Sequence, residues 1–340
     1  MTSMQRVAIL GGGTVGGQLV SLLQQRGEER VRIAGVLVRD AARPRSFRAW
    51  QELVNTDAAF VETADVVVEV MGGTEKASDL SLAALARGAT LVTANKAALA
   101  ERWREYLPYL EQGRVFFEAA VMAGTPVVGP LTWALRGSNP VALHAVLNGT
   151  CNVVLAAMDD GADYHEALAE AQRAGFAEAD PTLDVEGFDA AHKLTVLARL
   201  VFDPALEWDA VKAATRGISK LTPGALASAR QAGRRVRLVG SVEHAAGGWR
   251  AAVRPVELPE DHPLLAAGPT NAMLFTGEEC GQVLVKGPGA GGASTASGVL
   301  GDVLAALAGQ RGPAPLAAAA AAPRGEVVAE RFREVALGAL

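Results

Sequence analysis

An acidic stretch that ends in a lysine carries the clearest chemical signal in this sequence. Five carboxylates stand between Glu178 and Lys193, and the stretch enters an otherwise apolar helix predicted over residues 188–201. Asp189 and Lys193 are four residues apart and fall on one stripe of that helix, beside the core. Carboxylates bind an ammonium group, and a lysine can exchange a proton with an oxygen. Helix spacing alone leaves two interpretations open, a simple ion pair or a site for such chemistry.

Length, charge and cysteine content narrow the classes of protein that can hold such a site. A chain of 340 residues is too long for one ordinary core, so two domains are expected. The net charge is −5 and no basic block stands out, which argues against nucleic acid and anionic membranes as partners. No apolar run reaches the roughly 18 residues of a membrane span. The start lacks the features of a signal peptide, and the only cysteines are Cys151 and Cys280, so a cytoplasmic, small-molecule role is expected.

A glycine-rich loop near the start predicts a nucleotide site. Residues 7–10 form an apolar run typical of a strand, and a helix predicted to end at Gly27 follows the loop. In the Gly-x-Gly-x-x-Gly pattern the first glycine makes a tight turn, the second admits a pyrophosphate, and the third lets helix and strand pack. The helix N-terminus offers its N–H groups to the phosphates. The loop residues expected to contact the cofactor are Gly11, Gly13, Thr14, Val15 and Gly16.

The second strand bears on the choice between NADP and NAD. It is predicted over residues 31–38 and is followed by Arg39 and Asp40. An acid at this point binds the ribose 2′-hydroxyl of NAD, whereas an arginine accepts the 2′-phosphate of NADP. Because Arg39 comes first and Arg43 and Arg45 follow, the sequence favours NADP and leaves NAD open.

Strands and helices continue to alternate through the first half. Further strands are predicted over residues 65–71, 89–93 and 115–118, with helices that end near Gly88 and Gly113. This alternation predicts an α/β fold with a Rossmann-type, doubly wound parallel sheet. Ligands of such sheets gather beyond the carboxyl ends of the strands. The polar and glycine residues at these ends are Gly72, Gly73, Thr93, Asn95, Lys96 and Glu118.

The second half loses this regularity and predicts an α+β domain. A strand is expected over residues 141–147, and hairpins are expected over 234–256 and 273–285, where extended strands can join two subunits. A second glycine-rich loop, at 287–292, precedes a helix predicted over 296–308. A glycine loop at a helix start favours an anion or cofactor site, although a linker is the simpler interpretation.

Four segments describe the expected organisation. They are a nucleotide-binding domain at 1–130, a dimerisation and substrate-binding domain at 131–286, the glycine loop and a helix that returns to the nucleotide domain at 287–310, and a low-complexity tail at 311–340. Within the tail, alanine and proline dominate up to residue 322, and residues 326–340 fit a short helix.

Taken together, these stretches resemble homoserine dehydrogenase through almost the whole chain. Their order and spacing carry the resemblance more than any single motif does. The motifs are the glycine loop at 11–16, Val-Thr-Ala-Asn-Lys at 92–96, Glu-Ala-Ala-Val-Met-Ala-Gly-Thr-Pro at 118–126, Asn-Gly-Thr at 148–150, the acidic stretch at 178–193 and Gly-Pro-Gly-Ala-Gly-Gly at 287–292.

The resemblance implies reversible, NAD(P)-linked interconversion of L-homoserine and L-aspartate 4-semialdehyde, on the route to threonine, methionine and isoleucine. It implies a homodimer, and it makes Lys193 and Lys96 the catalytic lysines. The substrate residues that it implies are Glu178, Asp184, Asp189, Thr150 and Gly149. The cofactor residues are those of the first glycine loop with Arg39, Gly72, Thr93, Lys96 and Gly289. A monovalent cation, Na⁺, is expected at Glu118 with the backbone carbonyls of Val121, Ala123 and Thr125.

The implied chemistry suits these residue types. When hydride leaves or reaches the substrate carbon, the attached oxygen must lose or gain a proton, and an ammonium can supply it. A lysine works better near neutral pH if burial or a second lysine lowers its pKa from about 10.4. We favour Lys193 for the proton and Lys96 for polarising the oxygen or orienting the substrate.

The sequence is also compatible with two alternatives, and it shows one departure from the family pattern. Aspartate-semialdehyde dehydrogenase needs a thiolate, for which Cys151 is the candidate, and a non-catalytic NADPH sensor would need only the first glycine loop. Many relatives carry a ligand-sensing domain after the second glycine loop and its helix. Residues 317–322 are not such a domain, so threonine feedback through one is expected to be absent.

Overall fold

Two compact units make up this chain, and the computed structural model describes residues 4–27, 31–316 and 330–335 of it. Unit 1 comprises residues 1–129 and 290–315, and unit 2 comprises residues 130–289 and 316–340. The chain therefore leaves the first unit after residue 129 and returns to it for one further segment.

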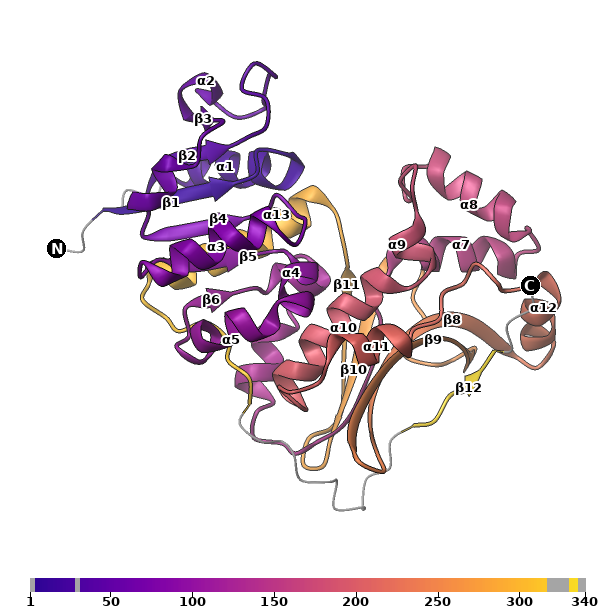
Figure 1. Ribbon diagram of the computed structural model, residues 1–340. Helices are drawn as coiled ribbons and strands as arrows, with labels where there is room; N and C mark the ends of the chain where they lie inside the picture. Colours follow the sequence, from indigo (N-terminus) through magenta and orange to yellow (C-terminus); the bar gives the residue numbers. More distant parts are fainter. Residues whose placement is uncertain (1–3, 28–30, 317–329, 336–340) are drawn as a thin grey trace. The chain divides into compact units, whose positions relative to one another are not determined.

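Unit 1 is built on a six-stranded parallel sheet with the strand order β3-β2-β1-β4-β5-β6 (Figure 1). The strands are β1 (Gln5–Leu10), β2 (Val31–Leu37), β3 (Val54–Asn55), β4 (Val66–Glu69), β5 (Thr90–Thr93) and β6 (Val115–Phe116). This is the order of a doubly wound dinucleotide-binding sheet, so the predicted Rossmann-type fold is confirmed. The short edge strand β3 carries no strand-like pattern and was not predicted.

Helices cover both faces of this sheet. Helices α1 (Thr14–Arg26) and α13 (Gly292–Leu307) contact each other and share one apolar cluster with the central strands. The opposite face carries α3 (Lys76–Ala86) and α5 (Trp103–Glu111), which follow α2 (Trp50–Leu53) and η1 (Ala59–Thr63) in the chain (Figure 1). Two short helices, α4 (Lys96–Glu101) and α6 (Ala119–Met122), begin just after strands β5 and β6.

Unit 2 is built on a six-stranded antiparallel sheet with the order β11-β10-β7-β8-β9-β12. Its strands are β7 (Pro140–Val146), β8 (Arg234–Ala245), β9 (Gly248–Pro259), β10 (Thr270–Gly277), β11 (Gly281–Pro288) and β12 (Arg333–Glu334). Both predicted hairpins are confirmed, since β8 pairs with β9 and β10 pairs with β11 across tight turns. The predicted α+β class of this region is confirmed with them.

The helices of unit 2 lie on one face of its sheet. Helix α10 (Phe188–Val201) contacts β7, β8 and β9, and it is buried from Ala190 to Val201, so no side of it is solvated. The others are η2 (Pro130–Ala134, a π-helix), α7 (Gly149–Asp159), α8 (Tyr164–Arg173), α9 (Thr182–Val185), α11 (Trp208–Ala213) and α12 (Pro223–Gln231). On the other face, Val146, Val239, Val256 and Leu274 belong to a separate apolar cluster.

The expected short helix over residues 326–340 is wrong where the structure describes that segment. Arg333 and Glu334 form strand β12 on the edge of the sheet, paired antiparallel to β9. The reason is tertiary, because Phe332 packs against the apolar cluster and against the ring of His144, at a centroid distance of 4.7 Å. Edge pairing then satisfies the backbone. The low-complexity residues 317–322, and the remainder of 326–340, lie outside the described residues.

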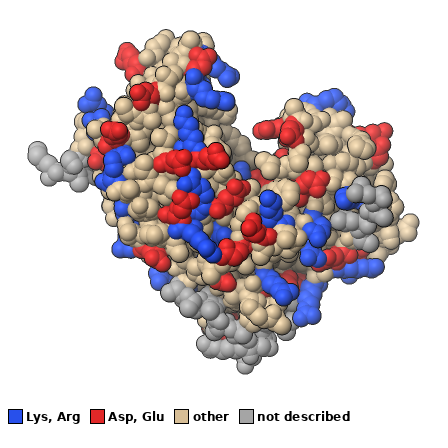
Figure 2. Space-filling model, in the orientation of Figure 1, with Lys and Arg blue, Asp and Glu red and all other residues tan. Residues whose placement is uncertain are grey.

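Surface charge and helix length bear on possible partners. Acidic and basic side chains are intermixed on the face of the molecule that Figure 2 shows. None of the helices in the described ranges is long and apolar enough to cross a membrane.

Candidate active site

The first glycine loop has the backbone geometry that a bound pyrophosphate needs. Gly11 has a φ of +112°, and a Cβ placed there would come within 2.9 Å of the backbone of Met71. A Cβ on Gly16 would overlap the carbonyl of Gly11, whereas nothing lies within 4 Å of one on Gly13. No side chain caps the N-terminus of α1. Gly13 and the first N–H groups of α1 therefore face open space that suits a phosphate.

The second glycine-rich loop brings another helix start to the same place. Gly291 has a φ of +109° and precedes α13, which has no side-chain cap either. A Cβ on Gly292 would come within 2.5 Å of the Thr14 side chain at the start of α1. Two helix N-termini thus adjoin within unit 1, which favours anion binding there. The predicted cofactor residue Gly289 belongs to unit 2 and packs directly on the side chain of Asn271.

The arginines after β2 differ in position. Arg39 and Arg43 are exposed, as is Asp40. Arg45 instead donates from Nη1 to the carbonyl of Gly12, at 2.9 Å, and from Nη2 to the carbonyl of Asp40, also at 2.9 Å. Arg45 is therefore the arginine that contacts the first glycine loop, a contact that the sequence pattern did not single out.

The ends of β4 and β5 form a polar cluster that the sequence reading predicted only in part. Glu69 accepts from the amide nitrogens of Met71, at 2.9 Å, and Gly72, at 3.0 Å, and from the hydroxyl of Thr93, at 2.9 Å. Burial raises the pKa of Glu69 above its usual value. Glu69 itself was missed, although a lone acid in a β-branched strand is the signal that would have found it.

Lys96 begins helix α4 in unit 1, and the residue before it, Asn95, caps that helix. Asn95 caps this helix by accepting from the amide of Ala98, at 3.1 Å. Asn95 also donates to the carbonyl of Gly73, at 2.7 Å. The structure thus brings the predicted residues Thr93, Asn95 and Gly73 together beside Lys96.

Lys193 is held at two points within unit 2. Its Nζ donates to Oδ2 of Asp189 and to the carbonyl of Leu147, both at 2.8 Å. The side chains of Lys193 and Asp189 are 8% and 13% exposed, so this is no solvated ion pair. An ammonium carries three N–H donors, and these two partners leave one for a substrate oxygen.

Asn148 joins the two aspartates of the acidic stretch. Its Nδ2 donates to Asp184, at 2.7 Å, and to Asp189, at 3.0 Å, while its Oδ1 accepts from the amide of Cys151 and caps α7. Thr150 donates to the carbonyl of Phe176, at 2.7 Å, and approaches Asp184 at 3.2 Å. Burial, with the nearby charge of Asp189, raises the pKa of Asp184. The predicted residues Thr150, Asp184, Asp189 and Lys193 therefore form one cluster, with Asn148 as a member that the prediction missed.

The other acids of the stretch have different surroundings. Glu178 is exposed at a loop before α9. Asp180 accepts from both the amide and the hydroxyl of Thr182, at 3.1 and 2.6 Å, and so fixes the start of α9. Glu186 accepts from the hydroxyl of Ser219, at 2.6 Å. Asp180, although exposed, and Glu186 are engaged by neighbouring residues, whereas Glu178 is exposed on its loop.

Glu118 lies where the sequence predicts a cation site, and its carboxylate accepts three backbone hydrogen bonds. Its oxygens accept from the amides of Val127, Val128 and Gly129, at 2.6, 2.8 and 2.7 Å. Ala123, a predicted carbonyl ligand, has a φ of +53°, which is strained for a residue with a side chain. Among the described residues no group of three or more histidine, cysteine or acidic side chains could hold a metal ion, so a cation here depends on backbone carbonyls.

Cys151 lies too deep to act as a nucleophile. Its side chain is fully buried, and its thiol donates to the carbonyl of Asp184, at 3.2 Å. Burial raises the pKa of the Cys151 thiol well above its usual value, so the thiolate is disfavoured. This geometry argues against thioester chemistry at Cys151.

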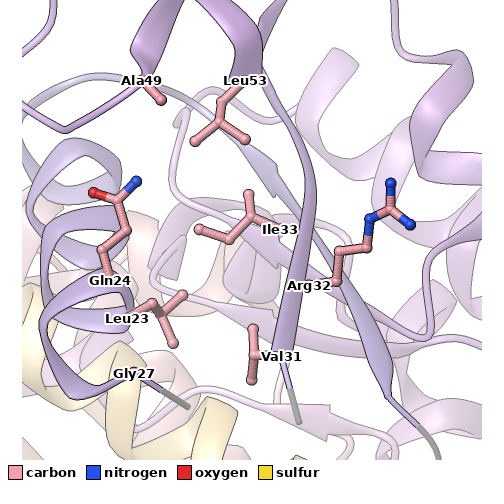
Figure 3. A pocket seen from close by; sticks show the side chains of 8 residues that line it. All are labelled: Leu23, Gln24, Gly27, Val31, Arg32, Ile33, Ala49 and Leu53. Carbon is pink, nitrogen blue, oxygen red and sulfur yellow. The ribbon is translucent and has the colours of Figure 1, made fainter. Parts of the chain in front are cut away.

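A cavity of about 400 Å³ in unit 1 lies elsewhere (Figure 3). Its lining comes from the end of α1, the start of β2 and the region of α2, and the side chains of Leu23, Ile33 and Leu53 point toward one another in it. Because β1 and β2 are parallel, the start of β2 lies at the amino ends of the strands, whereas the glycine loop follows the carboxyl end of β1. The cavity is therefore not the nucleotide site.

Comparisons with known proteins give a consistent family. Residues 11–114 match a family model described as the NAD binding domain of homoserine dehydrogenase, and residues 126–304 match one described as homoserine dehydrogenase. A homoserine dehydrogenase of Corynebacterium glutamicum is 41% identical over 318 residues, which cover 88% of this chain and 71% of that protein.

Solved structures agree with the sequence relatives. A homoserine dehydrogenase from Thiobacillus denitrificans has a TM-score of 0.82 and 36% identity, over 90% of this chain and 74% of that one. A hyperthermophilic archaeal homoserine dehydrogenase in complex with NADPH has a TM-score of 0.76 and 27% identity, over 91% of this chain and 99% of that one.

Proposed function

This chain belongs to the homoserine dehydrogenase family and is an NAD(P)-dependent oxidoreductase, and from that premise we propose how its residues carry out the reaction. The reaction is the reversible interconversion of L-homoserine and L-aspartate 4-semialdehyde. The observation that carries the proposal is the Lys193 ammonium, buried and held by Asp189 and Leu147 with one N–H donor left for a substrate oxygen. The buried thiol of Cys151 offers no comparable arrangement.

Lys193 handles the proton in this proposal. Bound nicotinamide supplies the chemistry of hydride transfer, to the carbonyl carbon in one direction and from the alcohol carbon in the other. In the reducing direction, the N–H bond of Lys193 breaks as its proton passes to the substrate oxygen, and the nitrogen keeps the electron pair. Asp189 then faces a neutral amine, and solvent returns the proton. In the oxidising direction, neutral Lys193 takes the proton of the alcohol.

Carboxylates hold the amino group of the substrate. Asp184 and Asp189 lie next to Lys193, and both are tied to Asn148, so their oxygens are fixed before the substrate arrives. Glu178 is exposed and can meet the substrate ammonium as a further carboxylate. Thr150 and Gly149 stand at the start of α7 beside them. We assign Lys96 the role of polarising the substrate oxygen or orienting the substrate.

We propose that the protein prefers NADP to NAD. The residues present fit a dinucleotide, because Gly13 faces open space and the start of α1 carries no side-chain cap. Arg39 is exposed at the end of β2 and can meet a 2′-phosphate, while Arg45 holds the loop that would carry it. The carboxylate of Asp40 could accept from the 2′-hydroxyl of NAD, so both cofactors should be tested.

Other assignments follow from the family and are proposals for this chain. We propose a homodimer that uses the antiparallel sheet of unit 2, Na⁺ at Glu118 with Val121, Ala123 and Thr125, and a role in making threonine, methionine and isoleucine. Residues 1–130 and 287–310 would then bind nucleotide, and residues 131–286 would bind substrate and the partner subunit. Both cysteines are free, which suits the reducing cytoplasm that we propose as its location.

One assay tests the activity directly. The purified protein is mixed with L-homoserine and either NADP or NAD at alkaline pH, and the absorbance of the reduced cofactor is followed. Lys193→Ala should abolish the signal while cofactor affinity stays nearly intact, and Lys212→Ala, at an exposed lysine of the same unit, is the control. No signal from the unmodified protein with either cofactor would overturn the proposal.

A further inference from the structure

We propose that Glu69 is a positioning residue, a single buried carboxylate that fixes the turn at residues 72–73, the loop before Lys96 and, through Met71, the glycine loop at Gly11. The inference rests on the proposed function for what these loops do. Glu69 acts through its neighbours and need not touch substrate or cofactor.

The carboxylate of Glu69 binds groups beyond its own strand. Glu69 ends β4 and is only 2% exposed. Its Oε1 accepts from the amides of Met71 and Gly72, and its Oε2 accepts from the hydroxyl of Thr93, the last residue of β5. An acid buried to this extent is costly unless donors surround it. These donors stand at or past strand ends, so the carboxylate organises the loops there more than the sheet itself.

Thr93 passes this constraint on to the lysine. Its hydroxyl oxygen accepts from the amide of Asn95, at 3.0 Å, and Asn95 caps α4, whose first residue is Lys96. Asn95 also donates to the carbonyl of Gly73, at 2.7 Å, and so closes the network back onto the turn after β4. Thr93 and Asn95 are 3% and 6% exposed, which leaves them little freedom to find other partners.

The turn that Glu69 holds also supports the nucleotide loop. Gly72 and Gly73 have φ values of +73° and +80°, and nothing lies within 4 Å of a Cβ built on either, so the turn borders open space. On its other side, a Cβ on Gly11 would come within 2.9 Å of Met71 Cα and N. The two loops therefore touch backbone to backbone, and a shift of Met71 must displace Gly11. One carboxylate thus sets the relative position of three loops.

Cofactor binding measured without substrate is the primary test. We compare the unmodified protein with Glu69→Gln and Glu69→Ala, using quenching of protein fluorescence by NADPH, steady-state KM and kcat, and the melting temperature. Glu69→Ala should weaken NADPH binding by about tenfold or more, since three donors lose their acceptor. Glu69→Gln keeps one acceptor oxygen, so its affinity for NADPH should lie between those of the unmodified protein and Glu69→Ala. In the assay with homoserine, the KM for NADP should rise and kcat should fall, because the cofactor loops and the loop before Lys96 shift together.

Glu279→Gln serves as the matched control. Glu279 also accepts from a hydroxyl and an amide, those of Ser138 at 3.0 Å and Asn139 at 2.7 Å, but it belongs to the hairpin of β10 and β11 in unit 2. The Glu279→Gln variant should bind NADPH as tightly as the unmodified protein. A lower melting temperature in the Glu69 variants with unchanged NADPH binding would reduce Glu69 to a stabilising residue and overturn the proposal.

A second pair of variants keeps the test decisive if Glu69→Ala does not fold. Thr93→Ser retains the hydroxyl that links Glu69 to Asn95, whereas Thr93→Val has nearly the same shape without it. Thr93→Val should bind NADPH several-fold more weakly than Thr93→Ser, and equal binding would contradict the relay. Weaker NADPH binding in these variants of a protein that does not oxidise homoserine would support the inference and overturn the proposed function instead.

Discussion

Lys193 Nζ lies 2.8 Å from Asp189 Oδ2, and this i,i+4 pair is buried with side chains 8% and 13% exposed. A pair of this spacing on a helix surface contributes only a few tenths of a kcal/mol. Burial removes both groups from water, so the pair persists only because Leu147 and Asn148 supply further hydrogen bonds. That arrangement fixes the position of the Lys193 ammonium within unit 2.

Replacing Lys193 by arginine separates charge from proton transfer. Arginine keeps a cation beside Asp189, so the fold should be retained, but its guanidinium does not give up a proton near neutral pH. We expect turnover of homoserine to fall by about a hundredfold or more, as is usual on loss of a general acid or base. Steady-state kinetics and a melting curve check this. Near-normal turnover in Lys193→Arg would refute the proton-transfer role.

Many of the candidate residues in each unit were predictable because they follow local rules. The glycine loop, the i,i+4 spacing of Asp189 and Lys193, and the strand that ends at Thr93 just before Lys96 are all visible as patterns. The long-range partners of these residues were not predictable. Asn148 reaches Asp184 across 36 positions, and Arg45 reaches Gly12 across 33, and no periodicity encodes which side chains a fold brings together.

Tertiary contacts also explain the errors at the element level. The expected short helix near the C-terminus is strand β12 because Phe332 finds an apolar cluster and the edge of β9 accepts a partner. Helix α10 is buried even at its polar residues, because His192 stacks on Trp208, at 4.4 Å, and Arg199 donates to the carbonyl of Leu206. Intrinsic preference is a weak guide where such contacts decide.

The protonation of Asp184 should make homoserine binding depend on pH. Burial raises its pKa, so lowering the pH protonates it before an exposed aspartate, and the substrate ammonium then loses a carboxylate partner. We expect the KM for homoserine to rise as the pH falls through the raised pKa. Asp184→Asn should show a high KM at every pH and no such dependence. A pH profile of KM that is the same in both proteins would contradict the assignment.

The same shift predicts how Asp184 affects stability. Because the pKa is higher in the folded protein than in the unfolded chain, the folded state binds the proton more tightly. The contribution of protonated Asp184 to the free energy of unfolding is present at low pH. It is lost as the pH rises through the pKa of Asp184 in the folded protein. At pH 7, Asp184→Asn should therefore raise the melting temperature while it impairs homoserine binding. The comparison of melting curves at pH 4 and pH 7 measures the effect, which should be smaller at pH 4.

Two arginines should affect cofactor use differently. Arg39 is exposed at the end of β2, so Arg39→Ala should raise the KM for NADP several-fold and leave the KM for NAD unchanged. Arg45 holds the carbonyls of Gly12 and Asp40, so Arg45→Ala should loosen the glycine loop and raise both KM values. Arg104→Ala, at an exposed arginine elsewhere in unit 1, is the control. Equal losses with both cofactors in Arg39→Ala would count against recognition of the 2′-phosphate.

Glu118 should contribute to stability whether or not a cation binds. Glu118→Ala leaves the amides of Val127, Val128 and Gly129 without their acceptor, and we expect the free energy of unfolding to fall by about 3 kcal/mol. Denaturant unfolding measures this, with Glu62→Ala, at an exposed acid of the same unit, as the control. If Na⁺ binds here, the melting temperature of the unmodified protein should be higher in sodium chloride than in choline chloride, and Glu118→Ala should reduce the difference. If Glu118→Ala does not change the difference in melting temperature between the two salts, the Glu118 carboxylate is not a ligand of Na⁺.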